Sequence, residues 1–186
     1  MLAVSLEDVL ANHRKRGVEC RLTGGGALGA FGEDGHFPEE AVFAEEGEEG
    51  RALEQEMMRR AKAYGLRILG PNTMGVLNPF AGFSTAFVDI HRAESPPPLT
   101  MVAQSGVFQV GASSFTDRMG KAIDVGNAGD VDVVDVLEYL EHDPQTRIIV
   151  LHLEGMKRGR RFLETAARIV PQKPIIAYKT GHSPAG

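Results

Sequence analysis

Residues 148–154 read Ile-Ile-Val-Leu-His-Leu-Glu, a short and almost continuously apolar run that an acid closes. A run of this length without alternation is typical of a parallel-sheet strand that is covered on both faces. Gly155 follows Glu154 and ends the strand. This stretch therefore predicts the centre of an α/β domain, and the neighbouring segments can be placed around it.

The segments around this strand alternate between helical and extended patterns. Asp130 is expected to cap a helix that ends at residues 143–144, and a second helix stops at Pro171. A third helix is expected from residue 106 to about 119. Short apolar runs predict three further strands, over residues 99–103, 122–125 and 174–179. Strands that alternate with helices of this length indicate βαβ units and a parallel sheet.

The first half of the chain, residues 1–92, is less regular, rich in glycine and locally acidic. Within residues 47–65, GEEGRALEQEMMRRAKAYG, the spacing is that of an amphipathic helix, which Gly65 stops. Its apolar face is expected to carry Leu53, Met57, Ala61 and Tyr64. Residues 66–70 are expected to form a short strand. Three prolines within residues 93–98 remove backbone donors and stiffen the chain, so this segment is predicted to be a linker.

Composition narrows the class of protein without indicating a chemistry. The chain has 186 residues and a net charge of -5, which argues against a nucleic-acid partner held by electrostatics. A single cysteine, Cys20, excludes an internal disulfide framework and a cysteine-rich zinc site, and the six histidines lack metal-ligand spacing, so no metal is expected. No apolar run approaches the roughly 20 residues of a membrane span, and no signal-peptide pattern begins the chain. We therefore expect a cytoplasmic protein without a membrane segment.

Three features invite a functional interpretation that the sequence does not favour. Residues 24–29 match the dinucleotide motif G-x-G-x-x-G, but the glycine- and proline-containing segment after them cannot sustain the helix that the motif must open. A loop or insertion is the better interpretation. His152, on the apolar run, is interpreted as a packed core residue, and His182, beside Ser183, as an exposed loop residue.

Small or polar residues follow all four predicted parallel strands, at the edge where open α/β sheets bind ligands. They are Gln104-Ser105-Gly106, Gly126-Asn127, Glu154-Gly155 and Thr180-Gly181. The first of these turns opens into a helix, so its backbone N–H groups and the helix dipole suit a phosphate; an ordinary turn capped by Ser105 is the alternative. Glu154 either holds an imidazole in orientation or is a solvated loop acid. The spacing alone leaves both alternatives open.

Five stretches taken together resemble a known family. They are RILGPNTMGV (67–76), VAQSG (102–106), VGNAGD (125–130), LEG (153–155) and KPIIAYKTG (173–181). In this order they resemble the NDP-forming acyl-CoA synthetases and, more distantly, the α subunit of succinyl-CoA synthetase. The resemblance extends over residues 45–186.

The resemblance implies an α/β fold in two parts. The end of a Rossmann-like CoA-binding domain would be followed by an incomplete flavodoxin-like, succinyl-CoA ligase-like parallel-sheet domain. Residues 1–92 would be the C-terminal part of the first domain with a glycine-rich insertion, residues 93–98 the linker, and residues 99–186 the second domain, truncated.

The resemblance also implies a reaction and a set of residues for it. The family converts acyl-CoA, ADP and phosphate to the acid, CoA and ATP through a phosphorylated histidine. By position, Glu154 would hydrogen-bond that histidine. The phosphate would be bound by Gln104, Ser105, Gly106, Val107, Gly126 and Asn127. CoA would be contacted by Pro71, Asn72 and Thr73.

Parts of the family pattern are expected outside this chain. The first βαβ unit would precede it, and the phosphorylated histidine, in a Ser-His-Thr-Gly motif, would follow it. ADP or ATP with Mg²⁺ would bind to a partner, an ATP-grasp domain or β subunit, and a homo- or hetero-oligomer is expected. Two alternatives remain: a non-catalytic module that binds CoA or acyl-CoA for regulation, and a flavodoxin-like domain in which residues 104–106 hold a flavin phosphate.

Overall fold

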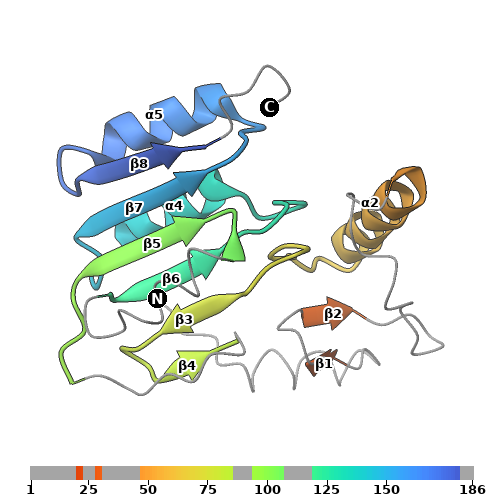
Figure 1. Cartoon of the computed structure of the whole chain (residues 1–186), viewed down its shortest axis with the longest axis horizontal. Helices are drawn as coiled ribbons and strands as arrows, with labels where there is room; N and C mark the ends of the chain where they lie inside the picture. Colours follow the sequence, from red (N-terminus) through yellow and green to blue (C-terminus); the bar gives the residue numbers. More distant parts are fainter. Residues whose placement is uncertain (1–19, 23–27, 31–46, 86–93, 107–118, 181–186) are drawn as a thin grey trace.

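The computed structural model describes residues 20–22, 28–30, 47–85, 94–106 and 119–180. Its main feature is a six-stranded sheet in the order β4-β3-β6-β5-β7-β8 (Figure 1). Its strands are β3 (Val76–Asn78), β4 (Phe83–Ser84), β5 (Leu99–Ala103), β6 (Lys121–Asp124), β7 (Ile148–Leu153) and β8 (Ile175–Lys179). The last four are parallel to one another, which confirms the parallel sheet that the sequence predicts. Their ends differ from the expected ones by at most one residue.

Two helices, α4 (Val133–His142) and α5 (Gly159–Ile169), cover one face of the parallel strands. The core between these layers is aliphatic. It includes Val102, Leu137, Leu140, Ile149, Leu151 and Ile169, all 2% exposed or less. This packing aligns the carboxyl ends of β5, β6 and β7 along one edge of the sheet. The strand-end residues that the sequence singles out therefore lie on a common edge.

The helix cap of α4 differs from the expected one. Asp132, not Asp130, is the N-cap: its carboxylate accepts hydrogen bonds from the N–H groups of Val134 and Asp135. The Asp135 carboxylate in turn accepts from the N–H of Asp132, which completes a capping box. Asp130 is two residues too early for the cap and pairs with Arg67 instead.

The expected strand at residues 66–70 is wrong. This segment is irregular because its backbone groups pair with loops and not with a strand: the N–H of Ile68 donates to the Asp130 carboxylate, and the C=O of Ile68 accepts from Val131. The strand comes later, as β3, which pairs antiparallel with β6 on one side and with β4 on the other. Residues ahead of the expected linker thus contribute two strands to the main sheet.

The helix predicted within residues 47–65 is confirmed as α2 (Glu48–Ala63). Its buried face is only partly the expected one. Ala61 is buried and Met57 half-buried, but Leu53 and Tyr64 are 40% and 67% exposed. A separate antiparallel pair of strands, β1 (Cys20–Leu22) and β2 (Leu28–Ala30), flanks the glycine-rich residues 23–27. The predicted helix over 107–118 and the loop with His182 lie outside the described residues.

A buried ion pair lies at the amino end of the sheet. Lys121 Nζ is 2.7 Å from Asp143 Oδ2, and the two side chains are 4% and 5% exposed. Thr146 donates to the same carboxylate, and its hydroxyl also pairs with that of Thr100 at 2.6 Å. Burial alone would raise the pKa of Asp143, but the hydrogen bonds from Lys121 and Thr146 outweigh it and lower that pKa.

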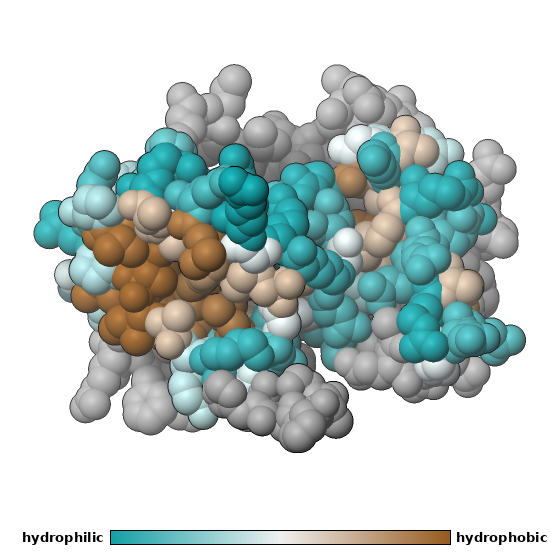
Figure 2. Space-filling view, turned by 90° about the horizontal axis from the view of Figure 1, so that it is seen from above, coloured by the Kyte–Doolittle hydropathy of each residue, from teal (hydrophilic) through white to brown (hydrophobic). Residues whose placement is uncertain are grey.

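The edge strand β8 borders an apolar surface. It pairs only with β7 among the described strands, and Ile176 and Tyr178 on it are each 59% exposed. On α5, Leu163 is 68% exposed, and Val170, which directly follows this helix, is 51% exposed. Seen from above, the side that carries α5 and β8 shows a continuous apolar area (Figure 2). We refer to these four side chains as the β8 edge patch.

Candidate functional site

Two loops meet over the carboxyl end of β6. One carries the expected CoA residues, and the other carries two of the expected phosphate residues, Gly126 and Asn127. The N–H of Asn127 donates to the C=O of Pro71 at 3.0 Å, and the N–H of Gly129 donates to the C=O of Gly70 at 2.8 Å. The amide of Asn72 donates to Asn127 Oδ1 at 3.4 Å. Two sets of residues that are about 55 positions apart in the sequence therefore form one surface.

The closeness of these loops depends on glycine at position 126. Gly126 has φ +51°, in the left-handed region, and a Cβ there would lie 2.2 Å from the C=O oxygen of Pro71. Two other residues hold positive φ here without being glycine, Asn72 at 54° and Ala128 at 50°. Backbone held in such sparsely populated conformations clusters at ligand sites, which favours a functional interpretation of this edge.

Gln104 links β5 to the end of β7. Its side-chain oxygen accepts hydrogen bonds from the N–H groups of Glu154 at 2.6 Å and Gly155 at 3.1 Å. The amide nitrogen Nε2 of the same side chain is the group that can donate to a phosphate. The structure thus gives Gln104 a positioning contact between two of the expected site segments, while Ser105 and Gly106 are half-buried beside it. Val107 lies outside the described residues.

Glu154 presents its carboxylate to solvent at the end of β7. Its backbone C=O accepts from Lys179 Nζ at 2.8 Å, so the next strand fixes the position of its main chain. His152 is 2% exposed, which confirms its interpretation as a core residue, and its Nε2 pairs with the Thr180 hydroxyl at 3.2 Å. Burial lowers the pKa of His152, although the charges of Glu154 and Asp124 oppose this.

Asp124, the last residue of β6, was not among the expected site residues. It is fully buried, and its carboxylate accepts hydrogen bonds from the N–H groups of Met74 at 2.7 Å and Gly126 at 3.0 Å. Burial raises its pKa, and these two hydrogen bonds oppose that effect; Glu154 raises the pKa further. The sequence signal was an acid at the end of an apolar strand, one position before Val125-Gly126.

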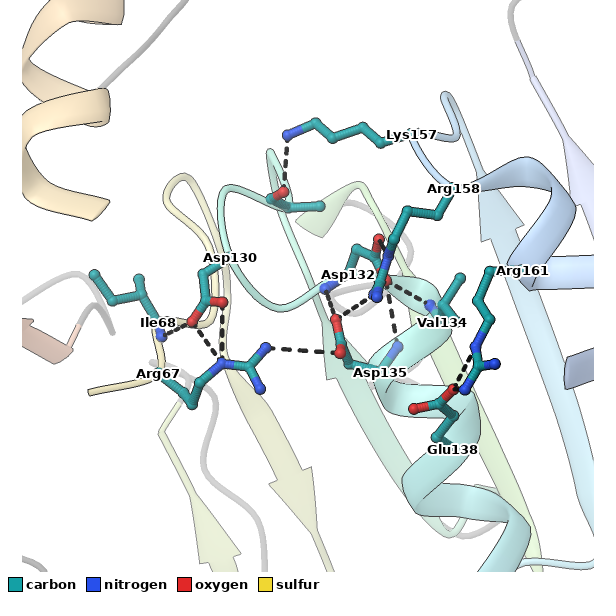
Figure 3. A network of polar contacts seen from close by, with 11 residues as sticks. Arg67, Ile68, Asp130, Asp132, Val134, Asp135, Glu138, Lys157, Arg158 and Arg161 are labelled. Carbon is teal, nitrogen blue, oxygen red and sulfur yellow. Dashed lines mark hydrogen bonds and ion pairs between the residues drawn. The ribbon is translucent and has the colours of Figure 1, made fainter. Parts of the chain in front are cut away.

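A network of arginines and aspartates borders the two loops (Figure 3). Arg67 pairs with Asp130 at 2.8 Å, and Arg158 pairs with both Asp132 and Asp135. Burial alone would raise the pKa of Asp130 and of Asp132, but the guanidinium hydrogen bonds hold both below their usual range. The network ties the segment before β3 to the first turns of α4 and α5.

Lys157 adds a direct hold on the second loop. Its Nζ donates to the C=O of Ala128 at 2.8 Å and to that of Asn127 at 3.4 Å. Lys157 is labelled above the network in Figure 3. The ammonium thereby stabilises carbonyl groups next to the strained residue Ala128. Sequence reasoning missed this residue, because nothing in its spacing relates it to residues 126–129.

The described part of the chain has neither a metal-binding cluster nor a membrane-spanning helix. No group of three or more His, Cys, Asp or Glu side chains there is arranged to hold a metal ion. Among its helices, none combines the length and the apolar character that crossing a membrane requires.

Comparison with known families identifies the second half of the chain. Residues 96–186 match the succinyl-CoA ligase-like flavodoxin domain. The match begins within the proline-rich segment and includes all four parallel strands.

Individual relatives extend this similarity into the first half. The α subunit of an ADP-forming acetate–CoA ligase I from Pyrococcus furiosus is 39% identical over 150 residues, which are 77% of this chain and 32% of that protein. An ADP-forming 4-hydroxybutyrate–CoA ligase from Nitrosopumilus maritimus is 31% identical over 152 residues, 78% of this chain and 22% of that protein. This chain thus spans a third or less of the length of these curated relatives.

Comparison with solved structures finds similarity to the same kind of enzyme. A dinucleotide-forming acetyl-coenzyme A synthetase 1 from Ca. Korarchaeum cryptofilum, in complex with phosphate and ADP, superposes with a TM-score of 0.69 at 35% identity. The superposition covers 77% of this chain and 32% of that one.

Proposed function

Residues 96–186 belong to the succinyl-CoA ligase-like flavodoxin domains, and on this premise we propose that the chain is part of an ADP-forming acid–CoA ligase. The reaction would convert acyl-CoA, ADP and phosphate to the acid, CoA and ATP by way of a phosphorylated histidine. One observation carries the proposal: residues 70–73 and 126–129 are hydrogen-bonded to each other on the carboxyl edge of a parallel sheet. A ligase of this kind must bring CoA and phosphate chemistry to a single place.

The two loops would divide the ligands between them. Pro71, Asn72 and Thr73 would contact CoA, and Gly126 and Asn127 would border the phosphate. A phosphate at this edge would also meet Ser105 and Gly106 after β5, where the Ser105 hydroxyl and backbone N–H groups can donate to its oxygens. Gln104 would hold residues 154 and 155 in place with its side-chain oxygen and would donate to the phosphate from its amide nitrogen.

Glu154 would act on the histidine. An exposed carboxylate on a fixed main chain can accept a hydrogen bond from one imidazole nitrogen, so that the other nitrogen is directed at the phosphoryl group. The histidine would come from a segment that follows the described residues in the family.

The partner and the cofactors follow from the same proposal. ADP or ATP with Mg²⁺ would bind to an ATP-grasp domain or a β subunit, which would approach the carboxyl edge. The name of the Pyrococcus furiosus relative, a subunit α, supports an assembly of more than one subunit. We further propose that the protein works in the cytoplasm and that residues 1–92, 93–98 and 99–186 are the CoA-binding part, the linker and the ligase domain.

Ligand binding by the 186-residue chain tests the proposal. Calorimetry with CoA and, separately, with inorganic phosphate should detect both ligands. Asn72→Gly removes the side chain but keeps the positive φ accessible, and it should weaken CoA binding about tenfold through the lost polar contact. Ser105→Ala should weaken phosphate binding by a similar factor. Glu164→Gln, on the exposed face of α5, is the matched control and should change neither.

The outcomes separate the functional alternatives. Absence of CoA binding by the wild-type chain would overturn the ligase proposal. If the chain binds CoA but not phosphate, and Ser105→Ala has no effect, the non-catalytic CoA-binding module becomes the better interpretation.

A further inference from the structure

We propose that Asp124 is a positioning residue that locks the loop of residues 70–75 onto the loop of residues 126–129, so that the CoA and phosphate contacts stay in one fixed arrangement. This inference rests on the proposed function for the identity of the ligands. The locking itself rests on the geometry around Asp124.

Every polar group of Asp124 is used to join these loops. Its N–H donates to the C=O of Gly75 at 2.9 Å, and its C=O accepts from the Thr73 hydroxyl. One carboxylate oxygen accepts from the N–H of Met74 and the other from the N–H of Gly126. Three of the four contacts hold residues 73–75 and the fourth holds the second loop.

The location of the carboxylate makes this bridge specific. Asp124 is 0% exposed, so no water replaces its hydrogen bonds when they are lost. A Cβ at Gly106 would lie 3.5 Å from Asp124 Oδ2 and 2.4 Å from the Met74 side chain. The bridge therefore also borders the turn that is proposed to receive the phosphate.

The bridge acts on the residues that would touch CoA. Thr73 and Met74 directly follow Pro71 and Asn72, so a loop held at residues 73–75 cannot shift without moving those contacts. Preorganisation of this kind raises affinity. The apparent dissociation constant equals the intrinsic one divided by the fraction of molecules that hold the binding-competent arrangement, so a larger fraction means tighter binding.

Two variants at Asp124 and one at the other end of the sheet test the inference. Asp124→Asn keeps one acceptor oxygen, whereas Asp124→Ala keeps none. We expect CoA affinity to fall about tenfold in the alanine variant and less in the asparagine variant. A tenfold loss corresponds to a free alanine variant that holds the binding-competent loop arrangement in about a tenth of its molecules. Asp143→Asn is the matched control: it alters another buried aspartate, 5% exposed, that touches neither loop.

Amide hydrogen exchange supplies a readout that needs no ligand. The N–H groups of Met74 and Gly126 should exchange faster in Asp124→Asn than in the wild type, relative to the core of β7. Asp143→Asn should leave this ratio unchanged, since a general loss of stability accelerates the core as well.

The results decide the inference separately from the proposed function. Unchanged exchange at both amides in Asp124→Asn would overturn the locking role, as would CoA affinities that are equal in wild type, Asp124→Asn and Asp124→Ala. Equal loss of CoA binding in Asp143→Asn would also overturn it. If no variant, wild type included, binds CoA while the exchange pattern is as expected, the proposed ligand is wrong and the locking role stands.

Discussion

Two buried aspartates, at opposite ends of the same sheet, have opposite electrostatic surroundings. Asp124 at the carboxyl end is held by neutral backbone N–H groups, and burial raises its pKa. Asp143 at the amino end is held by the ammonium of Lys121 and the hydroxyl of Thr146, which lower its pKa despite burial. At the amino end, the cation of Lys121 compensates the buried charge of Asp143. At the carboxyl end, only the dipoles of backbone N–H groups bind the carboxylate of Asp124.

This difference separates stability from function within one fold. A compensated buried pair is costly to break, because removal of one partner leaves the other charge buried. A carboxylate held by loop N–H groups instead orders the backbone beside a ligand site and retains an ionisation cost at neutral pH. We expect variants at the amino end to change only the free energy of unfolding, and variants at the carboxyl end to change ligand affinity as well.

We expect the largest change in the free energy of unfolding when the buried ion pair at the amino end is broken. Lys121→Met leaves the Asp143 carboxylate buried without its cation and should lower the free energy of unfolding by about 3–5 kcal/mol. Urea denaturation measures this loss. Arg160→Met, at an exposed pair with Glu164, is the control and should change stability by less than about 0.5 kcal/mol. If Lys121→Met loses no more stability than Arg160→Met, the buried ion pair does not make the amino end the more important one for stability.

Next in size is a backbone change at the carboxyl end. Gly126→Ala combines a positive φ with a Cβ 2.2 Å from the Pro71 oxygen, and it should cost about 2–4 kcal/mol and weaken CoA binding. Gly155→Ala, where an added Cβ meets nothing within 4 Å, should be nearly neutral in both measurements. Equal behaviour of these two variants in thermal unfolding would contradict the tight contact between the loops.

A smaller effect concerns the network that borders the loops. Arg158→Gln removes a half-exposed guanidinium from Asp132 and Asp135, so the loss should be about 0.5–1 kcal/mol in low salt. Screening should shrink the difference from wild type when denaturation is repeated at high ionic strength. A difference that does not depend on salt would mean that packing of the arginine stem, and not its charge, is what matters.

The smallest effect is a pair of opposite pH dependences. The lowered pKa of Asp143 means that its stabilisation is present above the ordinary carboxyl pKa of about 3.8 and is lost as the pH falls further, so the deficit of Asp143→Asn should shrink in acid. The raised pKa of Asp124 has the reverse sign: wild type gains stability as Asp124 is protonated above pH 3.8, so the deficit of Asp124→Asn should grow there as the pH falls. Denaturation across pH 3–7 checks both, and parallel curves would contradict the comparison.

The sequence predicted the parallel strands well because their signals are local. The apolar run at residues 148–153 and the turns that end the strands depend on neighbouring residues alone, and β5 to β8 follow them closely. The extended pattern at residues 66–70 failed because partners more than 60 positions away, Asp130 and Val131, bind its backbone.

The candidate site divides in the same way. Strand-end residues such as Asn127 and Glu154 could be identified from the rule that ligands bind at carboxyl edges. The bridging role of Asp124, the acceptor role of Gln104 and the contacts of Lys157 could not, because each depends on a tertiary hydrogen bond to a distant backbone group.

The β8 edge patch has a consequence for how this chain behaves in solution. Ile176 and Tyr178 lie on β8, beyond which no further strand is described, and Leu163 and Val170 are exposed apolar residues on and directly after α5. Such an edge is a template for a strand of a neighbouring molecule, and natural proteins protect it with charge or cover. Purified at high concentration, the chain should show concentration-dependent self-association in light scattering, and a single lysine in place of Ile176 should keep it dispersed.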